Sequence, residues 1–192
     1  MANCAVFLDR DGTLNEDPGY ICDPELVKLF PDVGETLFRL KNKLDLLFIV
    51  ISNQSGIARG LITKDQVDSV NQRINTLLND FNVSIDSFYY CPHHPDYSSS
   101  EELKCRKPSP EMVLKAAEEF QIDLSKSYFI GDSKADIECG FNASVKTILV
   151  KTGNGRESLS ILHNENKMPN FVADNFNEAG NFIINDMYGA NT

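Results

Sequence analysis

The sequence predicts an α/β protein, in which a mostly parallel β-sheet lies between two layers of helices. Two observations lead to this fold class. Short apolar runs of strand length alternate along the chain with longer stretches whose apolar residues recur at helical spacing. Strands that alternate with helices typically form a parallel sheet covered on both faces. The chain of 192 residues has the length of one domain, and we expect residues 1–192 to form a single domain.

Each predicted strand is a run of consecutive apolar residues that ends at a turn signal, which is typical of buried strands. The first covers residues 5–8 and leads directly into Asp9, and the second covers 46–51 and leads into Ser52. The remaining predicted strands cover 85–90, 128–131, 145–150 and 171–173. In a parallel sheet, the polar residues that follow these strands lie at one edge.

Helix signals separate the strands. Asp32 is placed to cap a helix whose apolar residues recur through Leu44, and Thr63 with Gln66 forms a capping-box sequence ahead of a second helix. The predicted helices cover 33–44, 64–81, 111–120, 135–141 and 179–184. The polar segment 153–170 carries no such pattern, and we expect it to be mobile.

The composition restricts the function classes. The net charge of −10 argues against a nucleic-acid partner, which favours a basic surface. No apolar run reaches the roughly 18 residues of a membrane span, and the first residues lack the basic and apolar parts of a leader. We therefore expect a cytoplasmic protein. Its five scattered cysteines are then expected to be thiols or metal ligands rather than disulfides.

Four polar clusters follow predicted strands or precede predicted helices. They are Asp9 with Asp11, Ser52 to Ser55, Arg106 with Lys107, and Asp132 with Asp136. Each has an ordinary interpretation taken alone, as a turn, a helix cap or a solvated charge. Their order along the chain is more specific: an acid pair, a hydroxyl residue, a lysine and a further acid pair. Two carboxylates at one strand tip repel each other unless a cation or a shared proton intervenes, and a hard divalent cation with oxygen ligands is the simplest remedy.

In this order the clusters resemble the four motifs of the haloacid dehalogenase (HAD) superfamily of phosphohydrolases. The resemblance spans residues 4–150 and implies a three-layer, Rossmann-like core. It implies that Asp9 is the nucleophile, that Asp11 is the acid and base, and that Ser52 and Lys107 hold the phosphoryl oxygens. It also implies a Mg²⁺ site formed by Asp9, the backbone carbonyl of Asp11, and Asp132. The connecting segments are too short for a cap domain, so we expect an open site walled by loops.

A narrower resemblance is to the heptose bisphosphate phosphatases within this superfamily. It is carried by the runs Asp17-Pro18-Gly19-Tyr20, Ser52-Asn53-Gln54-Ser55-Gly56-Ile57-Ala58-Arg59-Gly60, Tyr90-Cys91-Pro92-His93-His94-Pro95 and Cys105-Arg106-Lys107-Pro108. The resemblance implies an enzyme that removes the 7-phosphate of D-glycero-D-manno-heptose 1,7-bisphosphate, a small-molecule substrate, for the synthesis of surface glycans. We expect a monomer because the chain carries little surface insertion. The implied substrate-binding residues are Gly19, Tyr20, Asn53, Gln54, Ser55 and Arg106. A histidinol-phosphate phosphatase and a catalytically silent binding protein on the same fold remain alternatives.

The same resemblance implies a structural zinc site formed by Cys91, His93 and Cys105. The related proteins carry a further cysteine where this chain has Leu103, which cannot coordinate a metal. Structural zinc almost always takes four protein ligands. The sequence therefore leaves three interpretations open: a site completed by water, His94 or Asp96, a site that binds its metal weakly, and a site that has lost its zinc.

Overall fold

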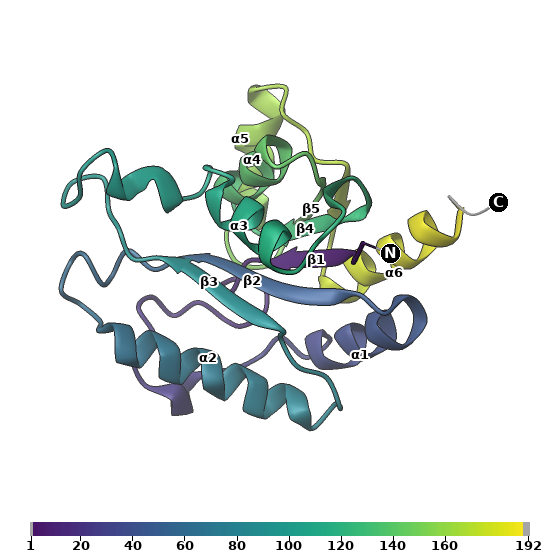
Figure 1. The fold of residues 1–192 in the computed structure, drawn as a ribbon, viewed down its shortest axis with the longest axis horizontal. Coiled ribbons are helices and arrows are strands. Elements are labelled where there is room, and N and C mark those ends of the chain that lie inside the picture. Colours follow the sequence, from purple (N-terminus) through teal and green to yellow (C-terminus); the bar gives the residue numbers. More distant parts are fainter. Residues whose placement is uncertain (1, 190–192) are drawn as a thin grey trace.

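The structure, a computed structural model, describes residues 2–189 and is built around one six-stranded sheet (Figure 1). All five strand pairings are parallel, and the strand order is β3-β2-β1-β4-β5-β6. The strands are β1 (Ala5–Leu8), β2 (Leu47–Asn53), β3 (Ser87–Cys91), β4 (Tyr128–Gly131), β5 (Lys146–Val150) and β6 (Phe171–Ala173). The predicted parallel α/β fold is confirmed.

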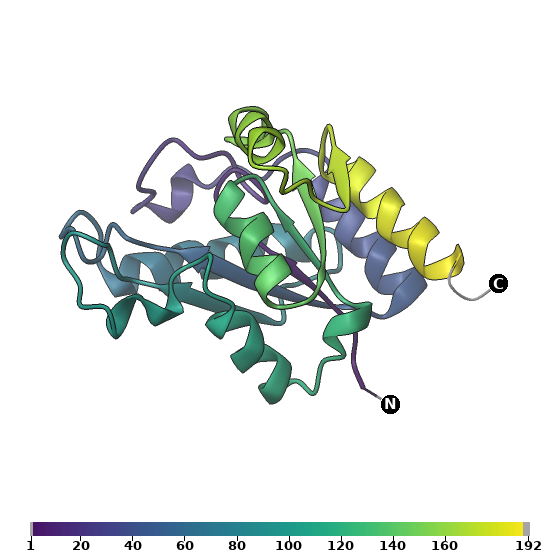
Figure 2. The ribbon, with the colours of Figure 1, turned by 90° about the horizontal axis from the view of Figure 1, so that it is seen from above.

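Helices cover both faces of the sheet. Alternate side chains of each strand point to opposite faces, so Val6 and Leu8 enter one apolar core and Phe7 enters the other. On the first face lie α1 (Val33–Leu44), α2 (Lys64–Asn79) and α6 (Phe176–Gly189); on the second lie α3 (Glu111–Glu119), α4 (Lys134–Asn142) and α5 (Gly155–Asn164). Figure 2 shows α1 and α6 side by side, which brings the last described helix onto the first. Three 3₁₀ turns complete the elements: Pro24–Leu26, Glu102–Cys105 and Leu124–Lys126.

Most predicted elements lie within two residues of the observed bounds. β1 and β4 match the prediction residue for residue, and the predicted capping box at Thr63 and Gln66 is formed. The main error is the segment 153–170, which contains α5. This helix buries only Gly155, Ser158 and Leu162, so its sequence gives a weak apolar pattern. It also needs glycine at its start, because a Cβ on Gly155 would lie 1.9 Å from the carbonyl oxygen of Val150.

The topology determines where a ligand can bind. β2 and β3 follow β1 on one side of the sheet, whereas β4, β5 and β6 lie on the other side. After β3 the chain returns to the other side of β1 and continues with β4. The neighbouring strands β1 and β4 therefore form a topological switch point, and such a point opens a crevice at the carboxyl ends of the strands. The connections near that crevice are loops and 3₁₀ turns, and residues 2–189 contain no separate cap domain.

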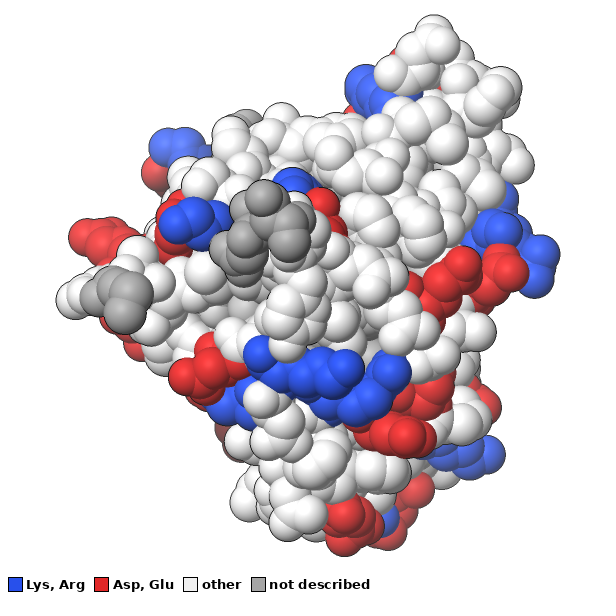
Figure 3. Space-filling view, turned by 90° about the vertical axis from the view of Figure 1, so that its right-hand side faces the viewer, with Lys and Arg blue, Asp and Glu red and all other residues white. Residues whose placement is uncertain are grey.

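The surface carries charges of both signs. On the face shown in Figure 3, Lys and Arg lie beside Asp and Glu rather than in a broad area of one sign. Exposed pairs include Lys134 with Glu165 and Lys104 with Glu101, and water screens such pairs so that they contribute little to stability. Among residues 2–189, no helix combines the length and the apolar character needed to cross a membrane.

Candidate active site

A polar pocket of about 410 Å³ opens at the β1–β4 switch point. It is lined by Asp9, Asp11, Asp17, Gly19, Tyr20, Ser52, Asn53, Gln54, Lys107, Asp132, Ser133 and Asn154. These residues come from the tips of β1, β2 and β4 and from the loops around them. The fold therefore brings together the four polar clusters that the sequence places at strand ends.

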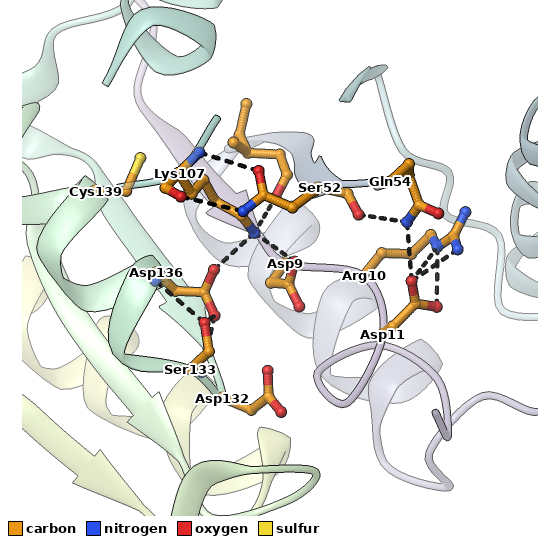
Figure 4. A network of polar contacts seen from close by, with 12 residues as sticks. Asp9, Arg10, Asp11, Ser52, Gln54, Lys107, Asp132, Ser133, Asp136 and Cys139 are labelled. Atoms are coloured by element: carbon orange, nitrogen blue, oxygen red, sulfur yellow. Dashed lines mark hydrogen bonds and ion pairs between the residues drawn. The ribbon is translucent and has the colours of Figure 1, made fainter. Parts of the chain in front are cut away.

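Lys107 connects two of these clusters (Figure 4). Its buried ammonium lies 2.5 Å from Asp9 Oδ1 and 2.6 Å from Asp136 Oδ1, and it also donates to the carbonyl oxygen of Ile51 at 2.6 Å. Burial disfavours the charged ammonium, but the carboxylates of Asp136 and Asp9 outweigh it and raise the pKa of Lys107. Lys107 therefore stays cationic and holds the Asp9 carboxylate in a fixed orientation.

Among the described residues, Asp9, Asp132 and Asp136 form a cluster of carboxyl groups that could hold a metal ion. One carboxylate oxygen from each lies within 4.8 Å of the others, and all three side chains are buried. Lys107 forms ion pairs with Asp9 and Asp136, so three carboxyl groups lie around one cation. Oxygen ligands with surplus negative charge suit a hard divalent cation, so the cluster fits Mg²⁺.

The ionisation of these acids reflects the same surplus. Burial, with the carboxylates of Asp136 and Asp132, raises the pKa of Asp9 well above its usual range, although Lys107 acts in the opposite direction. Burial and Asp136 raise the pKa of Asp132 to about 6. A divalent cation in the cluster would favour both carboxylates in their charged form.

Two glycines make room for Asp132. A Cβ on Gly12, which has a φ of +86°, would lie 2.3 Å from Asp132 Oδ2, and a Cβ on Gly153 would lie 2.2 Å from the same oxygen. That oxygen accepts from the backbone N–H of Asn154 at 2.7 Å. Both loops thus approach Asp132 closely and orient its carboxylate towards Asp9.

Asp11 lies in a separate hydrogen-bond network. Its carboxylate accepts from Arg10 through Nη2 at 2.7 Å, from Asn15 at 3.0 Å and from Gln54 at 3.0 Å. Burial disfavours the charged form of Asp11, but the Arg10 guanidinium and these donors lower its pKa. In Figure 4 the Asp11 side chain points towards Arg10 and Gln54, away from Asp9. The two aspartates of the first cluster are thus held by different partners.

The loop after β2 supplies Ser52, Asn53 and Gln54. Gln54 Nε2 donates to Ser52 Oγ at 2.7 Å, which leaves the Ser52 hydroxyl hydrogen free to point elsewhere. The Asn53 side chain accepts from the Lys107 N–H at 3.0 Å and donates to the Lys107 carbonyl at 3.2 Å. Asn53, a predicted substrate-binding residue, lines the pocket, and its side-chain amide also holds the main chain of Lys107.

The mouth of the pocket is formed by Gly19 and Tyr20. The Tyr20 hydroxyl accepts from Arg59 Nη1 at 2.7 Å, and the Tyr20 ring covers Gly56, where a Cβ would lie 2.6 Å from it. Arg106 is half-buried nearby and donates to the carbonyl of His93 at 3.1 Å. Of the predicted substrate-binding residues, Ser55 and Arg106 are the two that do not line the pocket.

The Cys91–Cys105 pair differs from the prediction. The structure joins these residues by a disulfide, with the sulfurs 2.09 Å apart, whereas Cys4, Cys22 and Cys139 are free thiols. Cys91 ends β3 and Cys105 ends the 102–105 turn, and these elements pack together. With both sulfurs consumed, the expectation of thiols or zinc ligands at this pair is wrong in this structure. His93 instead shares a hydrogen bond with Ser98 at 3.1 Å.

Sequence reasoning missed several residues of the site. Ser133 and Asn154 line the pocket but were not predicted as site residues, whereas Asp17 lies in the Asp17-Pro18-Gly19-Tyr20 loop that was expected to wall the site. Two further residues were missed: Arg10, which donates to Asp11, and Asn71, which accepts from Arg10. The one available signal was Asn71, a polar residue in the otherwise apolar face of α2.

Comparison with known proteins agrees with this geometry. A model of the HAD-hydrolase-like family matches residues 104–179. D-glycero-D-manno-heptose-1,7-bisphosphate 7-phosphatase of Chlorobaculum tepidum is 41% identical over 182 residues, which cover 91% of this chain and 90% of that protein. D-glycero-beta-D-manno-heptose-1,7-bisphosphate 7-phosphatase of Escherichia coli K12 is 41% identical over 154 residues, or 78% and 80% of the two chains.

A solved structure shows the same relationship in three dimensions. The D,D-heptose 1,7-bisphosphate phosphatase of B. bronchiseptica, complexed with magnesium and phosphate, superposes with a TM-score of 0.83 at 27% identity. The superposition covers 95% of this chain and 99% of that one. The fold and the site therefore define a phosphatase of the HAD-like hydrolases, a class whose phosphatases use Mg²⁺. Within this class, the chain belongs to the D-glycero-D-manno-heptose-1,7-bisphosphate 7-phosphatase family.

Proposed function

We propose that this protein removes the 7-phosphate of D-glycero-D-manno-heptose 1,7-bisphosphate through a phosphorylated Asp9. The observation that carries the proposal is the Lys107 ammonium, which is held by Asp9 and Asp136 at the edge of a buried acid cluster. This arrangement supplies a nucleophile, a fixed cation and a set of metal ligands in one pocket. The identity of about 40% to heptose bisphosphate phosphatases supports the choice of substrate.

The nucleophile in this proposal is the Asp9 carboxylate. One of its oxygens forms a bond to the C7 phosphorus while the bond from phosphorus to the sugar oxygen breaks. Lys107 and the Ser52 hydroxyl bind the phosphoryl oxygens as their charge shifts, and one such placed donor contributes roughly 2.7–4 kcal/mol to catalysis. Ser52 suits this role because Gln54 already occupies its oxygen as a donor.

Asp9, the backbone carbonyl of Asp11, and Asp132 are the proposed Mg²⁺ ligands. The ion would supply neutralisation of the phosphoryl oxygens, whose negative charge otherwise repels a carboxylate nucleophile. Asp136 completes the acid cluster but bonds to Lys107 and to Ser133, so we assign it to positioning the lysine.

Asp11 is the proposed acid and base. The negative phosphate of the bound substrate would raise the low pKa of Asp11 and so favour its protonated form. From that form Asp11 gives its proton to the sugar oxygen as that oxygen leaves, and it regains a proton from the water that attacks the phosphorus on Asp9. The second step breaks the bond from phosphorus to Asp9, releases inorganic phosphate and returns Asp9 to its starting form. The resting orientation of Asp11, away from Asp9, agrees with an acid that acts on the side of phosphorus opposite the nucleophile (Figure 4).

The distal part of the substrate is proposed to bind at the mouth, next to Gly19 and Tyr20. Arg106 lies beside this mouth, and a guanidinium suits a second phosphate group. Burial lowers the pKa of Arg106, and the electrostatic interaction with Tyr20 acts in the opposite direction. An incoming phosphate would compensate the half-buried charge in the same manner.

We also propose that residues 1–192 act as one domain, as a monomer and in the cytoplasm. A single sheet with two apolar cores accounts for the described chain, which supports the single domain. The proposed substrate carries two phosphates, and such a charged sugar does not cross a bilayer unaided, which supports the cytoplasm. Light scattering coupled to size-exclusion chromatography tests the monomer.

The substrate is tested by measuring phosphate release with Mg²⁺ from both anomers of heptose 1,7-bisphosphate and from histidinol phosphate. ³¹P NMR of the products should show loss of the 7-phosphate with the 1-phosphate retained. A higher kcat/KM for histidinol phosphate would overturn the proposed substrate. An absence of phosphate release from every compound would overturn the proposed activity.

A further inference from the structure

Arg10 is a fully buried cation next to the proposed acid and base. It is the largest of the fully buried side chains, with only 1% of its surface exposed. Taking a guanidinium out of water is costly unless its N–H groups are bound. Its ion-pair partner is Asp11, at 2.7 Å from Nη2. A buried charge of this kind is weak evidence for stability, which raises the question of what it does.

The contacts of Arg10 fix the plane of the Asp11 carboxylate. Nε lies 3.0 Å from Oδ1 and 3.1 Å from Oδ2, and Nη2 donates to Oδ2 at 2.7 Å. A planar fork of this kind sets direction as well as distance, which a single ammonium does not. Gln54 bonds to the same Oδ2 and to Ser52 Oγ, so the orientation of Asp11 is tied to that of Ser52.

Asn71 holds the guanidinium from the other side. It lies in α2 between Val70 and Ile74, on the face that packs against the sheet, and it is 7% exposed. Its Oδ1 accepts from Arg10 Nη1 at 3.1 Å. An amide among apolar residues of a packed helix face is expensive unless it is bonded. Within residues 2–189, this side chain has Arg10 as its hydrogen-bond partner.

We propose that Arg10 and Asn71 act as a positioning pair, which holds the Asp11 carboxylate in place for proton transfer to the departing sugar oxygen. The inference rests on the proposed function, in which Asp11 is the acid and base. Neither residue lines the pocket, so each acts through Asp11 rather than on the substrate. The pair makes α2, far along the chain from Asp11, part of the support of the site.

The test uses two leaving groups. The oxygen of a sugar needs a proton as it departs, whereas the oxygen of p-nitrophenyl phosphate leaves as a stable anion. A misplaced Asp11 therefore reduces kcat/KM for the sugar phosphate more than for the aryl phosphate. The variant is Asn71→Leu. The matched control is Asn75→Leu, one turn along α2, where the side chain bonds twice to the backbone of Ile85 and not to Arg10.

We expect Asn71→Leu to lower the sugar-to-aryl ratio of kcat/KM by about tenfold, a part of the 10²–10⁴-fold effect of an acid–base group. We expect Asn75→Leu to leave the ratio within about twofold of the parent protein, even where its melting temperature falls. Arg10→Lys keeps the buried charge but loses the fork, so it should lower the ratio as well. This second variant decides the question if Asn71→Leu does not fold.

Equal losses on both substrates, or a ratio in Asn71→Leu that matches Asn75→Leu, would overturn the positioning pair. Failure of the proposed function gives a different result. In that case the unmodified protein releases no phosphate from the sugar bisphosphate, and the comparison of variants does not arise.

Discussion

Gly12 lies directly against Asp132, so that a Cβ on Gly12 would sit 2.3 Å from the Asp132 Oδ2 atom. The two residues follow β1 and β4, which are neighbours in the sheet but lie 120 positions apart in the chain. The glycine thus allows the loop after β1 to close over a carboxylate delivered by β4. Its backbone φ of +86° adds a second reason for glycine at this position.

Gly12→Ala should therefore damage both stability and activity. The added methyl must displace Asp132. The alanine must also keep the positive φ of this position, a backbone conformation that costs of order 1–3 kcal/mol. Gly60→Ala is the control, since Gly60 has a φ of +68° but nothing within 4 Å of a Cβ. Urea unfolding should show losses in both variants, while phosphate release should fall at least tenfold only in Gly12→Ala. Equal activities in the two variants would contradict the role of the close approach.

Asp9→Asn should abolish turnover and leave the fold intact. The amide cannot form the phosphorylated residue, and Lys107 keeps Asp136 as its ion-pair partner. We expect phosphate release to fall by at least about 10³-fold, with an unchanged circular dichroism spectrum. Asp17→Asn, which removes an exposed carboxylate from the same pocket, should retain most of the activity. Substantial turnover by Asp9→Asn would refute the proposed nucleophile.

The raised pKa of Asp132 predicts a pH-dependent stability in metal-free protein. The folded value is about 6 and the ordinary value is 3.8, so the folded state binds more protons between these two pH values. Stability of the metal-free protein should therefore fall as the pH rises from about 4 to 6. Asp132→Asn removes this dependence and should raise the free energy of unfolding at pH 7 by about 1–3 kcal/mol.

Magnesium should reverse that dependence. The ion needs ionised carboxylates, so Mg²⁺ should bind and raise the melting temperature above about pH 6 and lose this effect as Asp132 is protonated. Melting curves with EDTA and with Mg²⁺, recorded from pH 4 to 8, measure both effects. A stabilisation by Mg²⁺ that is equal at pH 4 and pH 8 would show that the ion does not bind at this cluster.

Zinc binding should depend on the residue at position 103. Leu103 stands beside Cys105 where a fourth ligand is expected, and the structure pairs Cys105 with Cys91 instead. After reduction, Leu103→Cys should hold about one zinc per chain through dialysis, because the site then offers four ligands. Leu114→Cys adds a thiol at an exposed position of α3 and should hold no more zinc than the reduced parent protein. Equal zinc contents in the two variants would contradict this assignment.

The fold could be predicted well because parallel strands and capped helices have local signals. The apolar runs before Asp9 and Asp132 end where the strands end, so the meeting of these two acids follows from the topology. The partners of Asp11 could not be predicted in the same way. Arg10 is its chain neighbour, yet adjacent residues of an extended chain normally point apart, and Asn71 reaches the site only through the packing of α2.

The disulfide could not be predicted for a related reason. Between the end of β3 at Cys91 and Pro108, the path of the chain depends on tertiary contacts, and the spacing of Cys91, His93 and Cys105 suits a metal as well as a crosslink. The α5 helix was missed because glycine and serine, rather than large apolar residues, form much of its buried surface. Sequence patterns report where large apolar side chains recur, and they say little about close backbone contacts.

Asp136 accepts from the Ser133 N–H and hydroxyl at the start of α4 through one oxygen and binds the Lys107 ammonium through the other. One carboxyl group thus caps the start of α4 and binds the lysine that we propose to act in catalysis. A protein engineer cannot tune these two properties independently at this position. Any replacement of Asp136 that weakens its ion pair with Lys107 also removes the cap of α4. The melting temperature and the rate of phosphate release should therefore fall together.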